Sequence, residues 1–192
     1  GRWTIVQNGS FGYGGVSVGD ADGDGALDVA YAMHHNYSGA DFGDQLIEVA
    51  RGDGTGLAWT PWDDGLATDG ETYGMFGTVL ADFDSDGDLD LAANSFGCGN
   101  GVHAYLNDGG GTWSPTWRTG SGNSSEDITA GDVNNDGFPD LATGIEEGTI
   151  WLGDGTGRFV LADGNLPSGG VLGRRGPSLG DVNNDGFDDL AF

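Results

Sequence analysis

Four short segments of the chain hold acidic and amide side chains at a fixed spacing. They are "DADGDGALD" from Asp20, "DFDSDGDLD" from Asp82, "DVNNDGFPD" from Asp132 and "DVNNDGFDD" from Asp181. Each segment has an oxygen-bearing side chain at positions 1, 3, 5 and 9 and a glycine at position 6, where the chain must turn sharply. Such a concentration of hard oxygen donors is typical of Ca²⁺ sites, in which about six to eight oxygens surround the ion.

The spacing predicts one calcium ion for each segment, about four in all, with the backbone carbonyl of position 7 as a further ligand. The predicted ligands are Asp20, Asp22, Asp24, Ala26 and Asp28; Asp82, Asp84, Asp86, Asp88 and Asp90; Asp132, Asn134, Asp136, Phe138 and Asp140; and Asp181, Asn183, Asp185, Phe187 and Asp189. Four divalent ions would change the formal net charge from −25 to −17. Calcium is therefore expected to stabilise the fold and not to act as a catalyst.

Two other structures share part of this pattern. An EF-hand loop shares the first nine positions, but it needs a bidentate Glu at position 12 and a helix on each side. Position 12 is Tyr31, Ala93, Thr143 or Phe192, and the flanking residues favour strands. A plain Asp-rich turn, held by side-chain to backbone hydrogen bonds, would suit one copy. Four copies that keep every ligand position favour ion binding, with the ninth-position aspartates completing the ligand shell.

The elements that position these segments are predicted to be short strands. The first aspartates of the copies are separated by 62, 50 and 49 residues, so one unit is repeated. Each unit has a strand candidate before the acidic segment and one after it. A third candidate ends at an Asp/Gly turn such as "GDGTG", and a fourth carries aromatic residues. Four-stranded sheets that recur every 40 to 60 residues or so are typical of β-propeller blades.

The sequence therefore predicts an all-β fold, a single β-propeller segment over residues 1–192 with acidic loops between the first two strands of each blade. Residues 1–9 are expected to form the last strand of a preceding blade, because "GRWTIVQNG" matches "GRFVLADGN" at 157–165. Three blades are expected at residues 10–70, 71–120 and 121–167, followed by half of a fourth at 168–192. The mismatched ends indicate a piece of a larger propeller or, alternatively, identical copies that join head to tail.

The amino-acid composition argues against several classes of function. The chain has 31 acidic and 6 basic residues, so nucleic acid and anionic membranes are poor partners. No apolar stretch reaches about 18 residues, which argues against membrane insertion. A single cysteine excludes an internal disulfide and a cysteine-based zinc site. Because no nucleophile elbow, zinc signature or phosphate loop is present, the chain is not expected to be an enzyme.

The chain resembles the FG-GAP/VCBS repeat family, which includes calcium-loop propellers of integrin α-subunits, fungal lectins and secreted bacterial proteins. The four acidic loops carry the resemblance, with "FGYGGVSVGD" and "MFGTVLADF" in place of the family's Phe-Gly segment. The third and fourth copies lack that segment. The resemblance implies a secreted or cell-surface, calcium-stabilised propeller of seven or eight blades. We expect a non-catalytic recognition or adhesion module whose ligand is a glycan or an extracellular protein. The alternatives are a structural repeat of a surface or filamentous homopolymer, or part of a polysaccharide lyase.

Ligands are expected on the face opposite the acidic loops, where the connections between strands vary most. The long connection of the first blade offers either a polar binding patch or a solvated loop, and its polar residues are His34, His35, Tyr37, Asp41 and Asp44. Arg174 and Arg175 form either a carboxylate clamp or a surface pair. Four tryptophans of the aromatic strands are expected to pack in the core, with sugar stacking as the alternative; they are Trp59, Trp62, Trp113 and Trp117.

Overall fold

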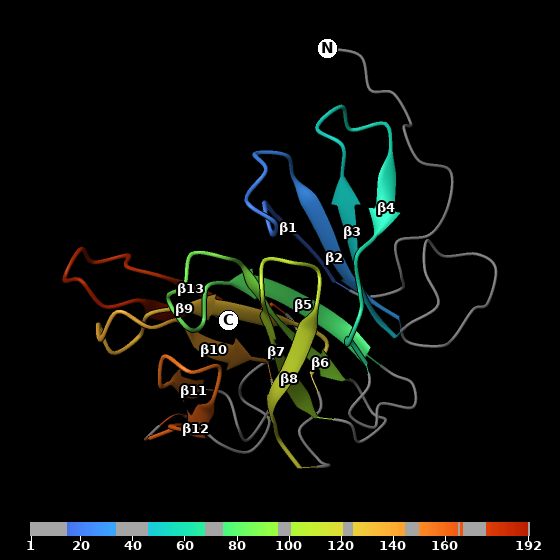
Figure 1. Cartoon of the computed structure of the whole chain (residues 1–192). Helices are drawn as coiled ribbons and strands as arrows, with labels where there is room; N and C mark the ends of the chain where they lie inside the picture. Colours follow the sequence, from blue (N-terminus) through green and yellow to red (C-terminus); the bar gives the residue numbers. More distant parts are fainter. Residues whose placement is uncertain are drawn as a thin grey trace.

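The computed structural model describes residues 15–33, 46–67, 75–95, 101–120, 125–144, 150–164, 166 and 176–191. These residues form three four-stranded antiparallel sheets and one two-stranded sheet (Figure 1). Sheet one contains β1 (Val16–Gly19), β2 (Asp28–Ala32), β3 (Ile47–Gly52) and β4 (Trp59–Pro61). Sheet two contains β5 (Met75–Ala81), β6 (Asp90–Ser95), β7 (Val102–Asn107) and β8 (Trp113–Arg118). Sheet three contains β9 (Ile128–Gly131), β10 (Asp140–Thr143), β11 (Ile150–Gly153) and β12 (Phe159–Leu161). Sheet four contains β13 (Ser178–Gly180) and β14 (Asp189–Ala191).

The register of the first two strands is the same in every sheet. The residue just before each acidic segment pairs with the ninth-position aspartate; the pairs are Gly19 with Asp28, Ala81 with Asp90, Gly131 with Asp140, and Gly180 with Asp189. Each acidic segment is therefore the loop that joins two antiparallel neighbours. We number these loops one to four with their sheets.

The second strands β2, β6 and β10 are buried along their whole length. Each lies between two strands of its own sheet and carries buried alanines, among them Ala30, Ala92 and Ala142. Small side chains at these positions allow the sheets to pack closely. The first strands are only partly covered, and in β1 the side chains alternate between exposed and half-buried.

Aromatic side chains fill the space between successive sheets. Trp62 of sheet one and Trp113 of sheet two pack edge to face with ring centroids 5.5 Å apart, and the Trp113 indole donates a hydrogen bond of 2.8 Å to the Trp62 carbonyl. Between sheets two and three, Trp117 packs edge to face on Trp151 at 5.2 Å. These contacts support the interpretation that the tryptophans of the fourth strands pack in the core.

The first strands β1, β5, β9 and β13 follow one another side by side, and the described sheets do not close into a ring. The predicted all-β architecture of four-stranded propeller sheets is thus confirmed as an open arrangement. Residues 1–9, expected to form an orphan strand, lie outside the described residues. No helix in the described part of the chain is long and apolar enough to cross a membrane.

Candidate metal centres

The carboxylates at positions 1, 3 and 5 converge in loops one and two. Oxygens of Asp20, Asp22 and Asp24 lie within 4.8 Å of one another, and the same holds for Asp82, Asp84 and Asp86. Ca²⁺–oxygen bonds of about 2.3 to 2.6 Å place two ligands on opposite sides of an ion roughly 5 Å apart. Each group of three carboxylates could therefore hold a single metal ion.

Two left-handed backbone positions curl each loop around its centre. The position-6 glycines have positive φ values, from 87° at Gly25 to 100° at Gly87. Position 4 is left-handed as well, with φ of 71° at Gly23, 62° at Ser85, and 56° and 63° at the two asparagines Asn135 and Asn184. The turn at position 6 was predicted from its glycine, whereas the left-handed residue at position 4 was not. In three of the four loops the residue type at position 4 could have indicated this conformation, because glycine and asparagine adopt it most readily.

Backbone amides hold the carboxylates of positions 1 and 5 in all four loops. The position-1 aspartate accepts from the position-6 glycine, at 2.9 Å in loop one and 2.8 Å in loop four. The position-5 aspartate accepts from the amide of position 7; the donors are Ala26, Asp88, Phe138 and Phe187, at 2.7 to 3.0 Å. The carboxylates are thereby oriented before any ion binds. That the position-7 carbonyl is a ligand stays a prediction.

One acceptor in loop one lacks a donor. Asp20 Oδ1 is buried and has no hydrogen-bond partner, whereas its other oxygen binds Gly25. In loops two to four the equivalent oxygen accepts the amide of position 5 at 3.0 to 3.1 Å. A buried carboxylate oxygen without a donor is costly, and a cation would satisfy it. The donor set of loop one therefore fits a hard cation.

The ninth-position aspartates have a second task that the sequence did not reveal. Asp28, Asp90 and Asp140 are fully buried, and each accepts two backbone amides. One oxygen binds the amide of position 2, at 2.7 to 2.9 Å. The other binds an amide of the third strand, donated by Gly52, Asn107 or Gly153 at 2.8 to 2.9 Å. Each aspartate thus ties the loop to its sheet, while its predicted role as an ion ligand is not tested by this geometry.

Burial controls the charge of these aspartates. It raises the pKa of Asp90 to about 7, and two backbone amides oppose the shift only in part. Burial likewise raises the pKa values of Asp28 and Asp140. The other carboxylates of the same loop add to the increase for Asp90, because like charges disfavour ionisation. A cation in the loop would favour the ionised form.

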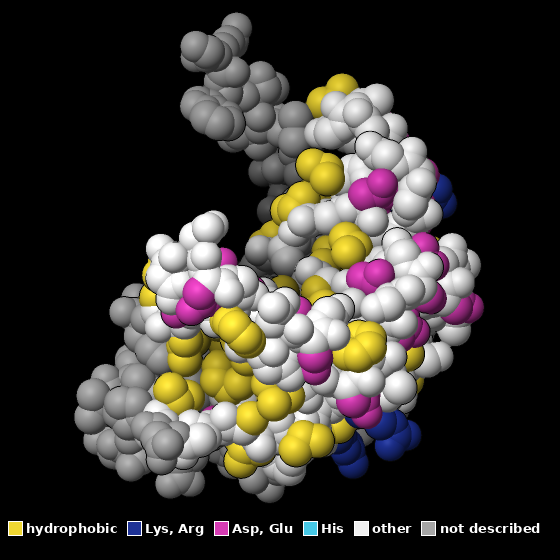
Figure 2. All heavy atoms as spheres, turned by 90° about the vertical axis from the view of Figure 1, so that its left-hand side faces the viewer, with side chains coloured by type: hydrophobic (Ala, Val, Ile, Leu, Met, Phe, Trp, Pro, Cys, Tyr) yellow, Lys and Arg dark blue, Asp and Glu magenta, His cyan; other side chains and the backbone are white. Residues whose placement is uncertain are grey.

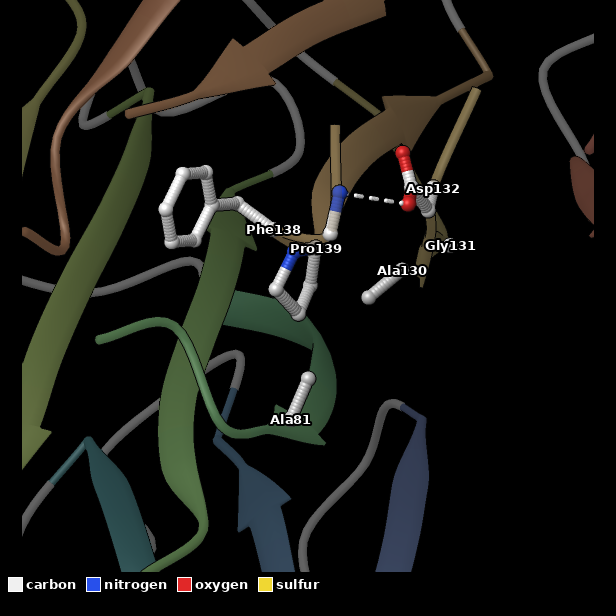
Figure 3. A pocket seen from close by; sticks show the side chains of 7 residues that line it. Ala81, Ala130, Gly131, Asp132, Phe138 and Pro139 are labelled. Carbon is white, nitrogen blue, oxygen red and sulfur yellow. Dashed lines mark hydrogen bonds between the residues drawn. The ribbon is translucent and has the colours of Figure 1, made fainter. Parts of the chain in front are cut away.

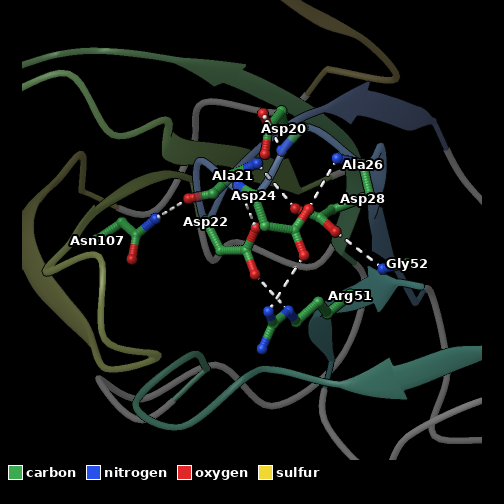
Figure 4. Close-up of polar contacts among 10 residues, drawn as sticks. Asp20, Ala21, Asp22, Asp24, Ala26, Asp28, Arg51, Gly52 and Asn107 are labelled. Atoms are coloured by element: carbon green, nitrogen blue, oxygen red, sulfur yellow. Dashed lines mark hydrogen bonds and ion pairs between the residues drawn. The ribbon is translucent and has the colours of Figure 1, made fainter. Parts of the chain in front are cut away.

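Arg51 contacts loop one, as Figure 4 shows. Its Nε pairs closely with Asp22, and its terminal nitrogen lies 3.2 Å from Asp24 Oδ2. These contacts raise the pKa of Arg51, chiefly through the hydrogen bond to Asp24. The equivalent residues one position before Asn107 and Gly153 are Leu106 and Leu152. Within the described residues, loop one is therefore paired with a basic side chain of its own sheet, whereas leucines occupy the equivalent positions beside loops two and three.

Loops three and four carry an asparagine at position 3 in place of an aspartate. In loop three the Asn134 side-chain amide donates to Asp136 Oδ2 at 2.8 Å, and its oxygen accepts the Asp136 amide at 3.1 Å. With one carboxylate fewer, these loops offer an ion less negative charge. Site affinity for Ca²⁺ depends on ligand charge, so they are expected to bind more weakly than loop two.

The ligand-face residues predicted from the sequence lie outside the described residues. They are the polar residues of the long connection of the first unit and the arginine pair: His34, His35, Tyr37, Asp41, Asp44, Arg174 and Arg175. The described residues do form a hollow of about 320 Å³ beside loop one. Its lining includes Arg51, Asp53, Thr60 and Trp62.

Sheets in series, each with an acidic loop between its first two strands, define an open β-propeller segment with repeated candidate ion sites. Residues 82–143 match the family model of an FG-GAP-like repeat, which confirms the predicted resemblance to FG-GAP/VCBS repeats. None of the curated proteins matches the chain in sequence.

A solved structure has a similar fold. It belongs to an Agrocybe aegerita lectin described as specifically recognising non-reducing terminal N-acetylglucosamine. The match has a TM-score of 0.55 and 18% sequence identity, and it covers 91% of this chain and 45% of the lectin chain. At this identity the likeness shows the fold alone. The chain spans less than half the length of that lectin.

Proposed function

We propose that this chain is a non-catalytic, calcium-stabilised recognition module that works outside the cell or at the cell surface, with glycans as its ligand class. The observation that carries the proposal is the set of preoriented carboxylates in loops one and two, on a fold shared with a lectin. The FG-GAP-like repeat in sheets two and three supports the same assignment.

Calcium fits the loops for electrostatic reasons. Three carboxylates within 4.8 Å repel one another, and in loop two no described basic side chain is paired with them in an ion pair. A divalent ion removes this repulsion and also satisfies acceptors such as Asp20 Oδ1. Oxygen ligands with no nitrogen or sulfur favour Ca²⁺ over the transition metals. About four ions, one in each loop, are proposed.

The hollow beside loop one is the proposed sugar contact within the described residues, although the sequence favoured the face opposite the acidic loops; Asp24 of loop one is among its lining residues. Trp62 is only half-buried, so its ring packs on Trp113 and also lines the hollow, and Thr60 is an exposed residue on β4. Aromatic faces with a few polar groups are suited to sugars, which have both apolar faces and hydroxyl groups. Asp53 is committed to its own turn, where it accepts the backbone amide and the hydroxyl of Thr55 at 2.9 and 2.6 Å. This commitment supports a binding role over acid/base chemistry.

A glycan array that includes terminal N-acetylglucosamine tests the proposal, with calcium and with chelator. We expect binding in calcium and its loss on chelation. Thr60→Arg should abolish binding, because the long side chain fills the hollow. Ser114→Arg is the matched control, because Ser114 is the equivalent exposed residue of sheet two. It pairs with Leu106 in the same way that Thr60 pairs with Arg51. Failure of the folded, calcium-loaded protein to bind any glycan would refute the ligand class.

The non-catalytic part of the proposal has its own assay. Incubation with pectin-like polysaccharides should release no unsaturated sugars, which a polysaccharide lyase would produce. Steady release of such products by pure protein would overturn this assignment in favour of the lyase alternative.

A further inference from the structure

Loop one differs from loops two and three in having a basic side chain against its carboxylates. Arg51 of β3 pairs with Asp22 through Nε and with Asp24 through a terminal nitrogen, as Figure 4 shows. Arg51 and Asp24 also line the hollow of about 320 Å³ beside the loop. One arginine therefore lies between a candidate metal centre and the proposed sugar contact.

The guanidinium group and a calcium ion would compete for the same oxygens. The Asp22 side chain is only 6% exposed, whereas the Arg51 side chain that covers it is 47% exposed. Asp22 and Asp24 are two of the three carboxylates that converge in loop one. Because the two cations need the same carboxylates and repel each other at short distance, binding of calcium favours release of Arg51.

The hollow that would receive the released side chain lies toward sheet two. Arg51 pairs with Thr60 across β3 and β4, so the two side chains lie on the same face of sheet one. Trp62 lines the hollow as well, and its ring packs edge to face on Trp113 of sheet two. A basic group, a threonine and an aromatic ring thus border one hollow, whose volume is in the range of small-molecule sites.

A second hollow, between sheets two and three, has a different character. Its volume is about 220 Å³, and it is mainly apolar, with Ala81, Ala130 and Pro139 among its lining residues (Figure 3). Its charged lining residue is Asp132, and no basic residue of the described chain lines it. This hollow would repel an anion, so the basic group is a property of the hollow beside loop one and not of hollows in general.

Calcium would change the charge beside Arg51 in favour of an anion. Without an ion, the three converging carboxylates and Arg51 leave an excess of two negative charges, which one Ca²⁺ would balance. Basic groups are scarce elsewhere: on the face shown in Figure 2, acidic side chains are scattered among apolar ones, and Lys and Arg lie at its edge. A released Arg51 would therefore offer an anion a basic group beside a neutralised loop.

We propose that the hollow beside loop one binds glycans that carry a carboxylate, and that Arg51 recognises this group once calcium occupies the loop. The inference rests on the proposed glycan-binding function and names its sugar class, the uronic acids. In the ion-free protein, Asp22 and Asp24 hold the guanidinium group that the sugar carboxylate holds in the calcium-loaded protein. The planar guanidinium group presents a fork of donors that matches a carboxylate.

Calcium and the acidic sugar are thereby linked. Calcium releases Arg51 for the sugar, and a sugar that holds Arg51 leaves the carboxylates to calcium, so each ligand strengthens binding of the other by the same factor. The net charge of −25 opposes anionic ligands, but physiological salt limits this repulsion to a range of about 8 Å. A sugar with one carboxylate is therefore compatible with the acidic surface, whereas a polyanion meets the charge of the whole chain.

The first test compares two oligosaccharides that differ only in the terminal sugar, which is glucuronic acid or glucose. Titration calorimetry measures both affinities in saturating calcium at about 0.15 M salt. The unmodified chain should bind the acidic sugar about tenfold more tightly, as expected for a partly exposed pair of charged groups. Arg51→Gln should bind both sugars equally. Arg51→Lys should recover only part of the preference, because lysine keeps the charge but lacks the fork.

Arg158→Gln is the matched control for net charge. It removes one exposed arginine from the turn between β11 and β12 of sheet three, and it should keep the full preference for the acidic sugar. Loss of the preference in this variant as well as in Arg51→Gln would mean that overall charge, and not Arg51, selects the sugar.

The release of Arg51 is measured without any sugar. In a heteronuclear NMR spectrum, the Arg51 Nε–H signal, assigned by its loss in Arg51→Gln, should shift when calcium saturates the protein. The affinity of loop one for calcium should also rise about tenfold in saturating acidic sugar and stay unchanged in the neutral sugar. A signal that calcium does not move, or a preference retained by Arg51→Gln, would overturn the proposal.

The outcomes separate this proposal from the proposed function. Equal affinities of the unmodified chain for the two sugars would overturn the preference for a carboxylate and leave glycan binding in place. Binding of neither sugar nor any other glycan by the folded, calcium-loaded chain would refute both.

Discussion

Asp136→Ala separates an ion site from an acidic turn. Without an ion, the Asp136 side chain accepts hydrogen bonds from the Phe138 amide at 2.9 Å and from the Asn134 side chain at 2.8 Å. Both are surface hydrogen bonds, so their loss should cost about 1 kcal/mol of unfolding free energy. In calcium the variant should also lose the stabilisation by the bound ion. That contribution is about 2.7 kcal/mol when free calcium is a hundredfold above Kd.

The assay is thermal unfolding of both proteins in calcium and in chelator. For a chain of this length, about 1 kcal/mol shifts Tm by roughly 2 to 4 °C. The variant should therefore melt about 3 °C lower in chelator and about 11 °C lower in calcium. Asp64→Asn, which removes one charge outside the four loops, is the control for net charge and should show no calcium-dependent difference. Equal losses in the two conditions would refute ion binding by loop three.

Three further predictions concern residues in the loops or in contact with them. Arg51→Leu should tighten calcium binding by loop one, because the guanidinium group competes with the ion for the carboxylates. The same variant should have a lower Tm in chelator, because Arg51 neutralises the loop when no ion is bound. Weaker calcium binding of the variant in titration calorimetry would mean that Arg51 orients the ligands instead. Asn107→Ala should lower the free energy of unfolding, measured in urea, by about 3 kcal/mol. The buried Asn107 side chain donates hydrogen bonds to the Ala21 carbonyl at 2.6 Å and to the Leu89 carbonyl at 3.2 Å, and both would be lost. A decrease of less than about 1 kcal/mol would contradict this bridging role. In chelator, the free energy of unfolding should fall as the pH rises from about 4 to about 7. The pKa of Asp90 is about 7 in the folded state and near 4 in the unfolded state, so the folded state binds more protons over this pH range. Urea unfolding at these pH values, with Asp90→Asn as control, measures the slope.

The repeat made the fold predictable. Four copies of one acidic segment fixed the positions of the loops, and the strand candidates around them agree with sheets of identical register. Turn residues and alternating apolar residues act locally, so they can be read from the sequence. The position-1, 3 and 5 carboxylates could be identified for the same reason, because they lie within five consecutive residues.

The ninth-position aspartates show what the sequence could not provide. A carboxylate that binds an ion and one that accepts backbone amides are the same residue in a sequence. Only the fold brings the Gly52 amide, 24 residues away, onto Asp28, and the Asn107 amide, 17 residues away, onto Asp90. The contact of Arg51 with Asp24 spans 27 residues and depends on the position of β3 beside loop one. These interactions follow from sheet register and not from local spacing.

Each loop divides its carboxylates between two tasks, and only one of these tasks is proposed to need calcium. The buried ninth-position aspartate ties the first three strands together without an ion, so chelation should leave the sheets folded. In loops one and two, the carboxylates at positions 1, 3 and 5 are oriented by backbone amides but lie close together, so a bound ion would relieve their mutual repulsion. Calcium should therefore act on the loops and not on the sheets. Titration with calcium should raise Tm, while the strand content measured by circular dichroism should be the same in chelator and in calcium.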